Sequence, residues 1–485
     1  METEKTVFKK NINLFAAITL VVGSMIGSGI FIVSADIART LGSPFYLILT
    51  WVITGVLTII AALSYGELAS MMPKAGGQYV YLKEAFNPMI GFLYGWTLFL
   101  VIQTGTIAAV AVAFAKFTGV IVPVLNENNI LLEVYSFKIS AAQLLAIASI
   151  AILTFINYRG VKNGKVLQVS FTIAKVIALA GLIILGFIIA SRNSFWTLNF
   201  SDLWTATTTI VNKNDLSITI HEISGLAIFS AIGVAMVGSI FSSDAWNNVT
   251  FIAGEIKNPK RNIPLSLFWG VLIVTIIYIL ANVAYLCLLP IKGSPEAIDI
   301  VGRGIQFSTS DRVGVAAAFR IFGDSAAIIM AVLIMISTFG CNNGLILSGA
   351  RVYYAMAIDG LFFKKVAKMN KFSVPGVALI FQGIWASLLC LSGKYGDLLD
   401  YVVFAVLLFY ILTIIGLFIL RKKKPNAERP YKAWGYPILP ALYIVFATAI
   451  CINLLINKPN YTWPGIIIVL IGIPVYFITK RRKLN

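Results

Sequence analysis

Long uninterrupted stretches of apolar residues alternate with short polar segments along almost the whole chain. A transmembrane helix needs about 20 apolar residues to cross the hydrocarbon core of a bilayer. Because the apolar stretches are continuous rather than alternating, they favour helices over the strands of a barrel. The sequence therefore predicts an all-α membrane protein with twelve transmembrane helices, at 13–33, 44–70, 88–115, 139–157, 165–190, 226–252, 264–290, 325–357, 374–392, 397–420, 437–457 and 463–480.

Two of the polar segments between these stretches are long, at 191–225 and 291–324. The first is rich in Ser, Thr and Asn and is predicted to be a loop. The second contains Val313–Phe322, which is apolar enough for a short helix outside the membrane. No internal sequence repeat is visible, but small and polar residues interrupt the first and the sixth predicted helix near mid-membrane.

The composition agrees with a lipid environment, since 59% of the residues are hydrophobic and 12% are charged, against about 25% charged in soluble domains. The 38 lysines and arginines outnumber the 20 carboxylates. With the N-terminus in the cytoplasm, most of these basic residues fall in cytoplasmic segments, as the positive-inside rule requires. We therefore predict a plasma or inner membrane protein with both termini cytoplasmic. The basic runs 421–424 and 480–483 indicate orientation rather than nucleic-acid binding.

Several kinds of functional site are not supported by the residue types present. The cysteines lie inside apolar stretches and form no CxxC pair, which argues against a disulfide framework and a zinc site; they are Cys287, Cys341, Cys390 and Cys451. The single histidine, His221, lies in a polar loop. The sequence thus predicts no enzyme, no metal site and no cofactor.

The first predicted helix contains three glycines and two serines within residues 23–29. Each glycine destabilises a helix by about 1 kcal/mol relative to alanine. One interpretation is close helix packing, because Gly23 and Gly27 form a GxxxG motif. The other is an unwound stretch at 27–29, whose free N–H groups would bind an anion such as a carboxylate.

The sixth predicted helix contains a carboxylate and two asparagines within residues 241–248. Such residues are unfavourable in a bilayer unless they line a polar cavity. They either form hydrogen bonds between helices or mark a second break, which would turn carbonyl groups toward an ammonium. Paired breaks in corresponding helices indicate a transporter binding site, and a substrate with both charges, an α-amino acid, would suit them.

Three segments resemble the amino-acid/polyamine/organocation (APC) superfamily of transporters: the GSGIF sequence at 27–31, residues 241–264, and the loop 73–79. From residue 10 onward the chain most resembles its L-type amino-acid transporters. The resemblance implies a LeuT-type fold with a 5+5 inverted repeat and two further helices. The implied divisions are a cytoplasmic 1–12, repeats at 13–190 and 226–420 around an extracellular loop 191–225, two helices within 421–480, and a tail 481–485.

The resemblance also implies where a substrate binds. Residues Gly27, Ser28 and Gly29 would hold its carboxylate, and Phe241 would form an aromatic gate. Carbonyl groups near the breaks would receive its amino group, and a polar side chain would lie nearby; these positions are Met25, Ile26, Phe241 and Asp244 for the carbonyls and Asn247 for the side chain.

The role of Asp244 stays open among three alternatives. Its carboxylate could cap the helix that restarts after the break, face the substrate, or shape the backbone while pointing away. A carboxylate that faces the substrate would favour cationic amino acids.

Lys175 is a second charge within a predicted helix, where an ammonium costs about 2.5–3.5 kcal/mol. It either snorkels to the interface or acts as an internal cation. The surrounding pattern resembles the fifth-helix lysine of sodium-independent family members, whose ammonium takes the place of a sodium ion. The resemblance implies the first break, Ser337 and Thr338 as its neighbours.

These observations predict sodium-independent transport, in the form of exchange, of neutral L-amino acids by alternating access. The alternative is a proton-coupled symporter of amino acids, cationic ones included, in which Lys175 changes its protonation. A channel would need rings of polar or charged residues, and only isolated intramembrane charges are present.

The predicted partners are the amino-acid substrate and the lipid bilayer. Animal L-type transporters carry a cysteine in the outer loop after the third helix, which links them to a heavy chain. The corresponding residues 118–138 contain no cysteine. We therefore expect no disulfide-linked heavy chain and no nucleic acid, and a monomer or weak homo-oligomer.

Overall fold

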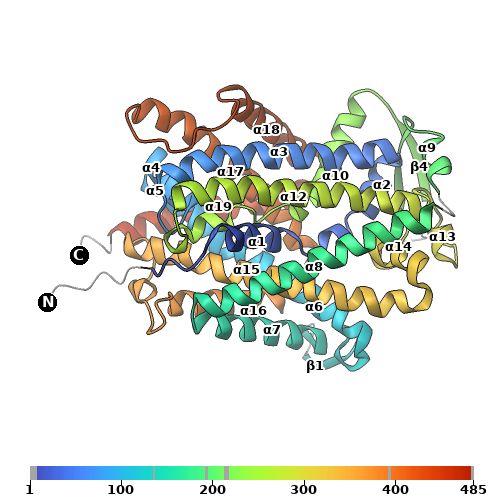
Figure 1. Ribbon diagram of the computed structural model, residues 1–485, viewed down its shortest axis with the longest axis horizontal. Coiled ribbons are helices and arrows are strands. Elements are labelled where there is room, and N and C mark those ends of the chain that lie inside the picture. The colour runs from blue at the N-terminus through green and yellow to red at the C-terminus, as the bar shows by residue number, and fades with distance from the viewer. Residues whose placement is uncertain (1–7, 135–136, 192–194, 212–217, 392–394, 482–485) are drawn as a thin grey trace.

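The helices of the computed structural model run close to one long axis and form a single bundle (Figure 1). The structure describes residues 8–134, 137–191, 195–211, 218–391 and 395–481. Both ends of the chain lie at one end of this bundle, which we call the termini end. Helices α9, α13 and α14 and strand β4 lie at the opposite end, which we call the hairpin end. The predicted segment 1–12 and tail 481–485 lie mostly outside the described residues.

The helical segments follow one another along the whole chain. They are α1 (Leu14–Met25), α2 (Ser34–Leu41), α3 (Pro44–Met71), α4 (Gln78–Ala85), α5 (Pro88–Thr97), α6 (Gln103–Ile121), α7 (Ala141–Tyr158), α8 (Val161–Ala190), α9 (Trp196–Phe200), α10 (Leu226–Ser242), α11 (Asn248–Phe251), α12 (Pro259–Leu288), α13 (Ile300–Arg303), α14 (Val313–Phe322), α15 (Ala326–Ile358), α16 (Gly376–Cys390), α17 (Tyr395–Lys423), α18 (Ile438–Asn457) and α19 (Pro459–Arg481). A π-helical turn, η2 (Leu98–Ile102), joins α5 to α6.

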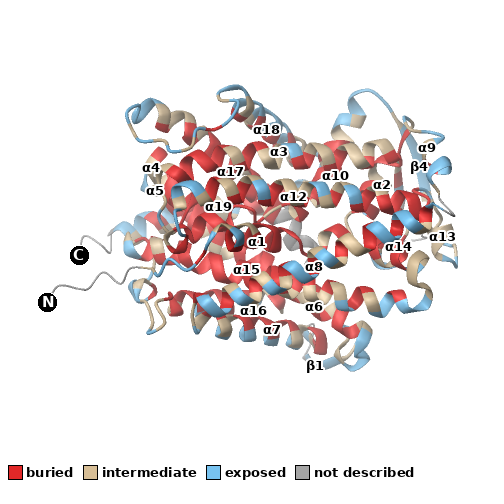
Figure 2. Ribbon diagram, viewed as in Figure 1, coloured by how far each residue is buried: buried red, intermediate tan, exposed pale blue. Residues whose placement is uncertain are grey.

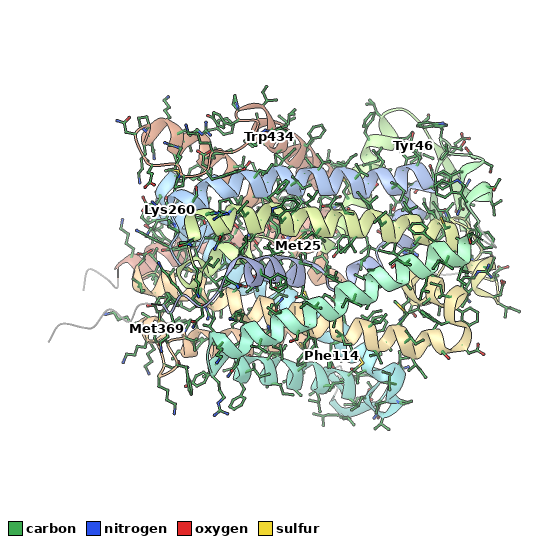
Figure 3. All side chains as sticks on the ribbon, viewed as in Figure 1. Met25, Tyr46, Phe114, Lys260, Met369 and Trp434 are labelled. Carbon is green, nitrogen blue, oxygen red and sulfur yellow. The ribbon has the colours of Figure 1, made fainter. Side chains whose placement is uncertain are left out.

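The twelve predicted transmembrane helices are confirmed. Within the described residues nine helical stretches are long and apolar enough to cross a membrane, and three shorter apolar helices, α1, α10 and α16, complete the set. Helices α1 and α10 are short because each ends inside the bundle. Figure 3 shows Met25, the last residue of α1, near the middle of the long axis.

The polar segments outside the bundle are more ordered than the sequence suggested. Helix α14 has the predicted bounds Val313–Phe322. The expectation of a plain loop at 191–225 is wrong, because this segment contains α9 and an antiparallel hairpin of β3 (Ala206–Val211) and β4 (Ile218–Ile223). A second hairpin joins β1 (Ile130–Val134) and β2 (Phe137–Ser140). The β-branched residues in β3 and β4 favour extended backbone, a signal that outweighs their polarity.

Side chains at the helix starts explain several helix boundaries. The Asn13 carboxamide accepts the Ala16 N–H at 2.9 Å and begins α1. Ser43 before α3 and Asn87 before α5 act in the same way, each followed by a proline. Ser140 and Gln143 form a reciprocal capping box at the start of α7. These pairs satisfy N–H groups that have no partner within the helix.

The interior of the bundle surrounds the point where α1 ends. Helix α1 packs against α8, α12 and α15, and α10 packs against α2, α3, α17 and α18. Figure 2 shows the largest buried region around α1, α15 and α17, whereas exposed residues gather on the outer helix faces and at the two ends. The two short helices therefore terminate where water and lipid are excluded.

A buried carboxylate fixes the termini end. Glu67, near the end of α3, is fully buried and accepts two hydrogen bonds from Arg421 of α17, at 2.9 and 2.6 Å. Its second oxygen also accepts the Ala433 N–H at 2.7 Å. The arrangement ties α3 to the end of α17 and the loop that follows.

We predict that Glu67→Gln lowers the free energy of unfolding by about 3 kcal/mol, because it leaves a guanidinium without its charged partner. The matched control is Glu84→Gln, which removes the exposed ion pair with Lys424 and should cost less than about 1 kcal/mol. Thermal unfolding of the purified proteins in one detergent compares the two. Equal loss of stability in both variants would contradict the role given to Glu67.

Candidate functional site

The first transmembrane helix is interrupted in the middle of the bundle. Helix α1 ends at Met25, and Ile26 has an extended backbone with φ −75° and ψ 98°. A single 3-10 turn, η1 (Gly29–Phe31), follows before α2 begins at Ser34. The unwound stretch predicted at 27–29 is thus confirmed. The other interpretation, a continuous helix whose glycines only allow close packing, is wrong.

The sixth transmembrane helix is interrupted in the same region. Helix α10 ends at Ser242 and α11 begins at Asn248. Between them Ala245 has a φ of 65°, a left-handed conformation that residues other than glycine rarely adopt. The predicted second break is confirmed.

The two breaks touch each other at Gly29 and Ser242. A Cβ atom on Gly29 would lie 2.1 Å from the Ser242 Oγ and 2.8 Å from its Cβ. Only a glycine allows this approach. At Gly27, by contrast, the nearest atom to an added Cβ would be the Cys341 Sγ at 3.6 Å, an ordinary contact.

The N–H groups of the first break are the unengaged part of its backbone. Those of Gly27, Ser28 and Gly29 have no backbone partner within the described residues. Their carbonyl groups, in contrast, are used: Gly27 accepts the Ser337 hydroxyl at 3.0 Å, and Gly29 accepts two N–H groups of the following turn. Free donors in a water-excluded interior can bind an anion.

The Lys175 ammonium lies in the first break. Its Nζ donates to the carbonyl oxygens of Gly23 at 2.9 Å, Ile26 at 2.6 Å and Ser337 at 2.8 Å. The side chain is 1% exposed, so the snorkelling alternative is wrong. All three ammonium donors are satisfied by neutral carbonyl groups, and the lysine links α8 to α1 and α15.

The two predicted neighbours of Lys175 are placed differently. Ser337 contacts the ammonium through its carbonyl, and its hydroxyl, with one proton to donate, lies 3.1 Å from the Ile26 oxygen and 3.0 Å from the Gly27 oxygen. Thr338 donates to Ile334 of its own helix at 2.7 Å. Successive helical residues point about 100° apart, so only Ser337 faces the break. No group of three or more His, Cys, Asp or Glu able to hold a metal occurs in the described part of the chain.

Tyr278 of α12 bridges the ends of both interrupted helices and was not singled out from the sequence. Its hydroxyl lies 3.1 Å from the Met25 carbonyl and 3.0 Å from the Ser242 carbonyl. The ring packs edge-on against Trp51. Nothing in the sequence distinguishes this tyrosine from other tyrosines in apolar stretches.

Asp244 does not cap the restarting helix, which was the first alternative for its role. The residue at the start of α11 is Asn247, whose side chain makes no capping hydrogen bond. The Asp244 carboxylate instead accepts the hydroxyl of Tyr410 in α17 at 2.5 Å. Tyr410 is a second site residue that the sequence did not reveal.

The Asn247 side chain forms a hydrogen bond with α4, which lies near the termini end. Its amide donates to the Gln78 side chain of α4 at 2.9 Å. Gln78 in turn donates to Thr413 at 3.1 Å and to the Phe409 carbonyl at 3.2 Å. Asn247 therefore couples the second break to α4 and α17.

A small cavity of about 10 Å³, room for about one water molecule, lies beside the second break, between α6, α15 and α17. Asp244, Asn247 and Asn248 line it together with apolar residues such as Val406. The buried Asn248 Nδ2 has no hydrogen-bond partner within the described residues. Phe241, the predicted gate, lies in the last turn of α10, half-buried, and is not part of this lining.

Known proteins resemble this chain over nearly its full length. The amino acid permease family profile matches residues 12–476. The serine/threonine exchanger SteT of Bacillus subtilis (strain 168) is 29% identical, with 100% of both chains covered. Large neutral amino acids transporter small subunit 2 of Oryctolagus cuniculus is 31% identical, with 97% of this chain and 80% of the relative covered. The b(0,+)-type amino acid transporter 1 of Mus musculus is 28% identical, with 99% and 90% covered.

The profile match covers both breaks and Lys175, so the resemblance includes the site and not only the bundle. Family and relatives are transporters rather than enzymes. The chain therefore belongs to the amino acid permease family of the APC superfamily and is a multi-pass membrane transporter of amino acids.

Proposed function

We propose that this protein exchanges neutral L-amino acids across the membrane without sodium, by alternating access around the two breaks. The observation that carries the proposal is the first break itself, where unpartnered N–H groups lie next to carbonyl groups already held by Lys175. The substrate carboxylate binds the N–H groups of Gly27, Ser28 and Gly29. The following α2 adds the positive end of a helix dipole.

The amino group of the substrate binds carbonyl oxygens at the ends of α1 and α10, the negative ends of their dipoles. A carbonyl oxygen accepts two hydrogen bonds. The Ile26 oxygen accepts the Lys175 ammonium and lies 3.1 Å from the Ser337 hydroxyl, whose single proton it shares with the Gly27 oxygen. The Met25 oxygen accepts one hydroxyl, and no backbone hydrogen bond to the Asp244 oxygen occurs within the described residues. We therefore assign the amino group to Met25 and Asp244.

Lys175 supports independence from sodium. A sodium ion requires several oxygen ligands, and the oxygens that the first break and α15 offer are bound to the ammonium. The ammonium is also part of the protein, so it cannot be released together with the substrate as a bound sodium ion would be. The names of two relatives, an exchanger of serine and threonine and a transporter of large neutral amino acids, support exchange and neutral side chains.

The distribution of charge supports a cytoplasmic termini end. Lysines and arginines gather in the segments at this end, such as 421–424 and 364–371. This is the pattern of the positive-inside rule. All four cysteines are buried and none lies in residues 118–138, which supports a transporter without a disulfide-linked heavy chain.

A second function, proton-coupled uptake that includes cationic amino acids, is favoured by one observation. The Asp244 carboxylate lines the cavity beside the second break, where it could pair with a positively charged side chain. The hydrogen bond from Tyr410 to its Oδ1 argues against this, because it holds the carboxylate toward α17.

The proposed function is tested in proteoliposomes that contain the purified protein and a labelled neutral amino acid. Uptake should require unlabelled amino acid on the far side, should be the same with and without sodium, and should not need a pH gradient. Neutral amino acids should compete, and lysine and arginine should not. Uptake driven by a pH gradient into empty vesicles would establish the proton-coupled alternative instead.

We predict that Lys175→Ala reduces exchange by at least about tenfold, because three carbonyl groups lose their partner in a water-excluded site. The exposed lysine of the Lys116–Glu127 ion pair provides the control, Lys116→Ala, which should exchange at the wild-type rate. Both proteins should be monodisperse by size-exclusion chromatography. Wild-type exchange by Lys175→Ala would reduce this lysine to a structural role.

We predict that Gly29→Val abolishes substrate binding, since its side chain would displace Ser242 and cover the free N–H groups. Gly27→Ala is the matched control, because its Cβ has room beside Cys341, and it should bind within about fivefold of wild type. Ligand-induced thermal stabilisation measures both, by the linkage of binding to unfolding. Unchanged affinity in Gly29→Val would refute the assignment of the carboxylate.

A further inference from the structure

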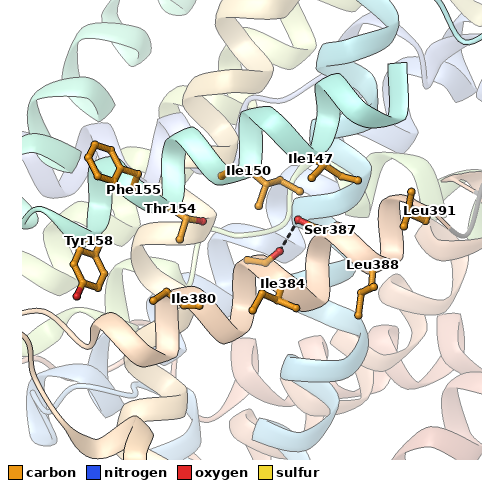
Figure 4. Close-up of a pocket in the computed structure, with 12 residues that line it drawn as sticks. Ile147, Ile150, Thr154, Phe155, Tyr158, Ile380, Ile384, Ser387, Leu388 and Leu391 are labelled. Carbon is orange, nitrogen blue, oxygen red and sulfur yellow. Dashed lines mark hydrogen bonds between the residues drawn. The ribbon is translucent and has the colours of Figure 1, made fainter. Parts of the chain in front are cut away.

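An apolar groove runs along the outside of the bundle between α7 and α16, far from the two breaks (Figure 4). Small side chains on the facing helices are part of its lining, among them Ala151, Gly383 and Ser387. Larger exposed side chains such as Phe155, Ile384 and Leu388 border it. The groove is therefore a hollow on a surface that faces lipid.

The groove extends over the depth of one leaflet. Tyr158 and Ile380 line it toward the termini end, and Ile147 and Leu391 line its other end (Figure 4). Residues 147–158 of α7 cover about 16 Å at the helical rise per residue. Half of a bilayer's hydrocarbon core is about 15 Å, so the groove can accommodate one extended acyl chain.

Two basic residues lie at the end of the groove near the termini end. The Arg159 guanidinium lies 5.5 Å from the centre of the Phe155 ring, which borders the groove. A hydrogen bond of 2.8 Å from Asn370 to the Tyr158 carbonyl holds the loop that carries Lys371 next to it. Both basic side chains are exposed.

These two charges are not neutralised by the protein. None of the ion pairs within the described residues includes Arg159 or Lys371. The adjoining residues 158–166 contain no carboxylate. A second copy of the chain would not supply one, because a two-fold contact through this groove would bring the same positive ends together.

We propose that this groove binds an anionic phospholipid, with one acyl chain between α7 and α16 and the phosphate on Arg159 and Lys371. The apolar lining removes the chain from contact with neighbouring lipids, and the two basic residues supply the charge that a zwitterionic headgroup would not neutralise. Each basic residue near an anionic lipid contributes a factor of about five in affinity. The site is independent of the substrate site.

The headgroup assignment is tested by native mass spectrometry of the full-length protein, released from detergent after incubation with equal amounts of phosphatidylglycerol and phosphatidylcholine. The wild type should retain phosphatidylglycerol preferentially. Arg159→Gln with Lys371→Gln should lower that preference about 25-fold, two factors of about five. The control Lys422→Gln removes an exposed charge of α17 at the same end and should leave the preference unchanged. Equal retention of both lipids by the wild type would overturn the proposal.

The acyl-chain assignment is tested by filling the groove. Ala151→Trp places a large side chain in the groove, where it competes with the acyl chain for the same space. It should reduce lipid retention at least about tenfold, a loss of about 1.4 kcal/mol of binding free energy. Ile152→Trp, on the same helix but outside the groove lining, is the matched control and should retain lipid. Ser387→Leu serves if Ala151→Trp does not fold. If a folded variant with the groove filled still retains lipid, the proposal is overturned. A change in the oligomeric mass of such a variant would also overturn it, because it would show that the groove is a protein interface.

Discussion

The structure depends on how a broken backbone is satisfied inside a membrane, where an unpaired polar group costs several kcal/mol. Interrupting α1 exposes carbonyl groups, and one ammonium binds three carbonyls at the junction. Lys175 bonds to Gly23 and Ile26 from α1 and to Ser337 from α15. The ammonium charge is thereby stabilised by hydrogen bonds to neutral carbonyl groups rather than by a carboxylate, and α8, α1 and α15 are joined at one point.

The donors and the acceptors of the first break differ in how far they are already hydrogen-bonded. Lys175, Ser337 and Tyr278 contact the carbonyl groups of the break, whereas the N–H groups at 27–29 have no backbone partner within the described residues. Free donors can bind the anionic end of a ligand, and the Met25 oxygen, which contacts a single hydroxyl, has room for one more donor. The contact of Gly29 with Ser242 keeps the second break within reach of the other end of the same ligand.

The termini end is closed by buried charge, in contrast to the neutral bonding of the breaks. Glu67 binds Arg421, and Glu255 binds Arg351 at 2.9 Å with both side chains almost fully buried. The Glu255 carbonyl also accepts the Ile12 N–H at 3.1 Å, so the segment before α1 is held against the loop after α11.

The sequence by itself determined the membrane class, the twelve helices and the short helix Val313–Phe322, because apolar length acts through neighbours along the chain. It located both candidate breaks through local clusters of glycine and polar residues, but left close packing or hydrogen bonds between helices as alternatives that the structure decided. It also identified Lys175, since a lone charge in an apolar stretch is visible without a structure. Only the tertiary structure decided that Tyr278 bridges the two breaks, that Tyr410 binds Asp244 and that Thr338 faces away. Those contacts join residues far apart in the chain, and their geometry depends on how the helices pack and rotate against one another.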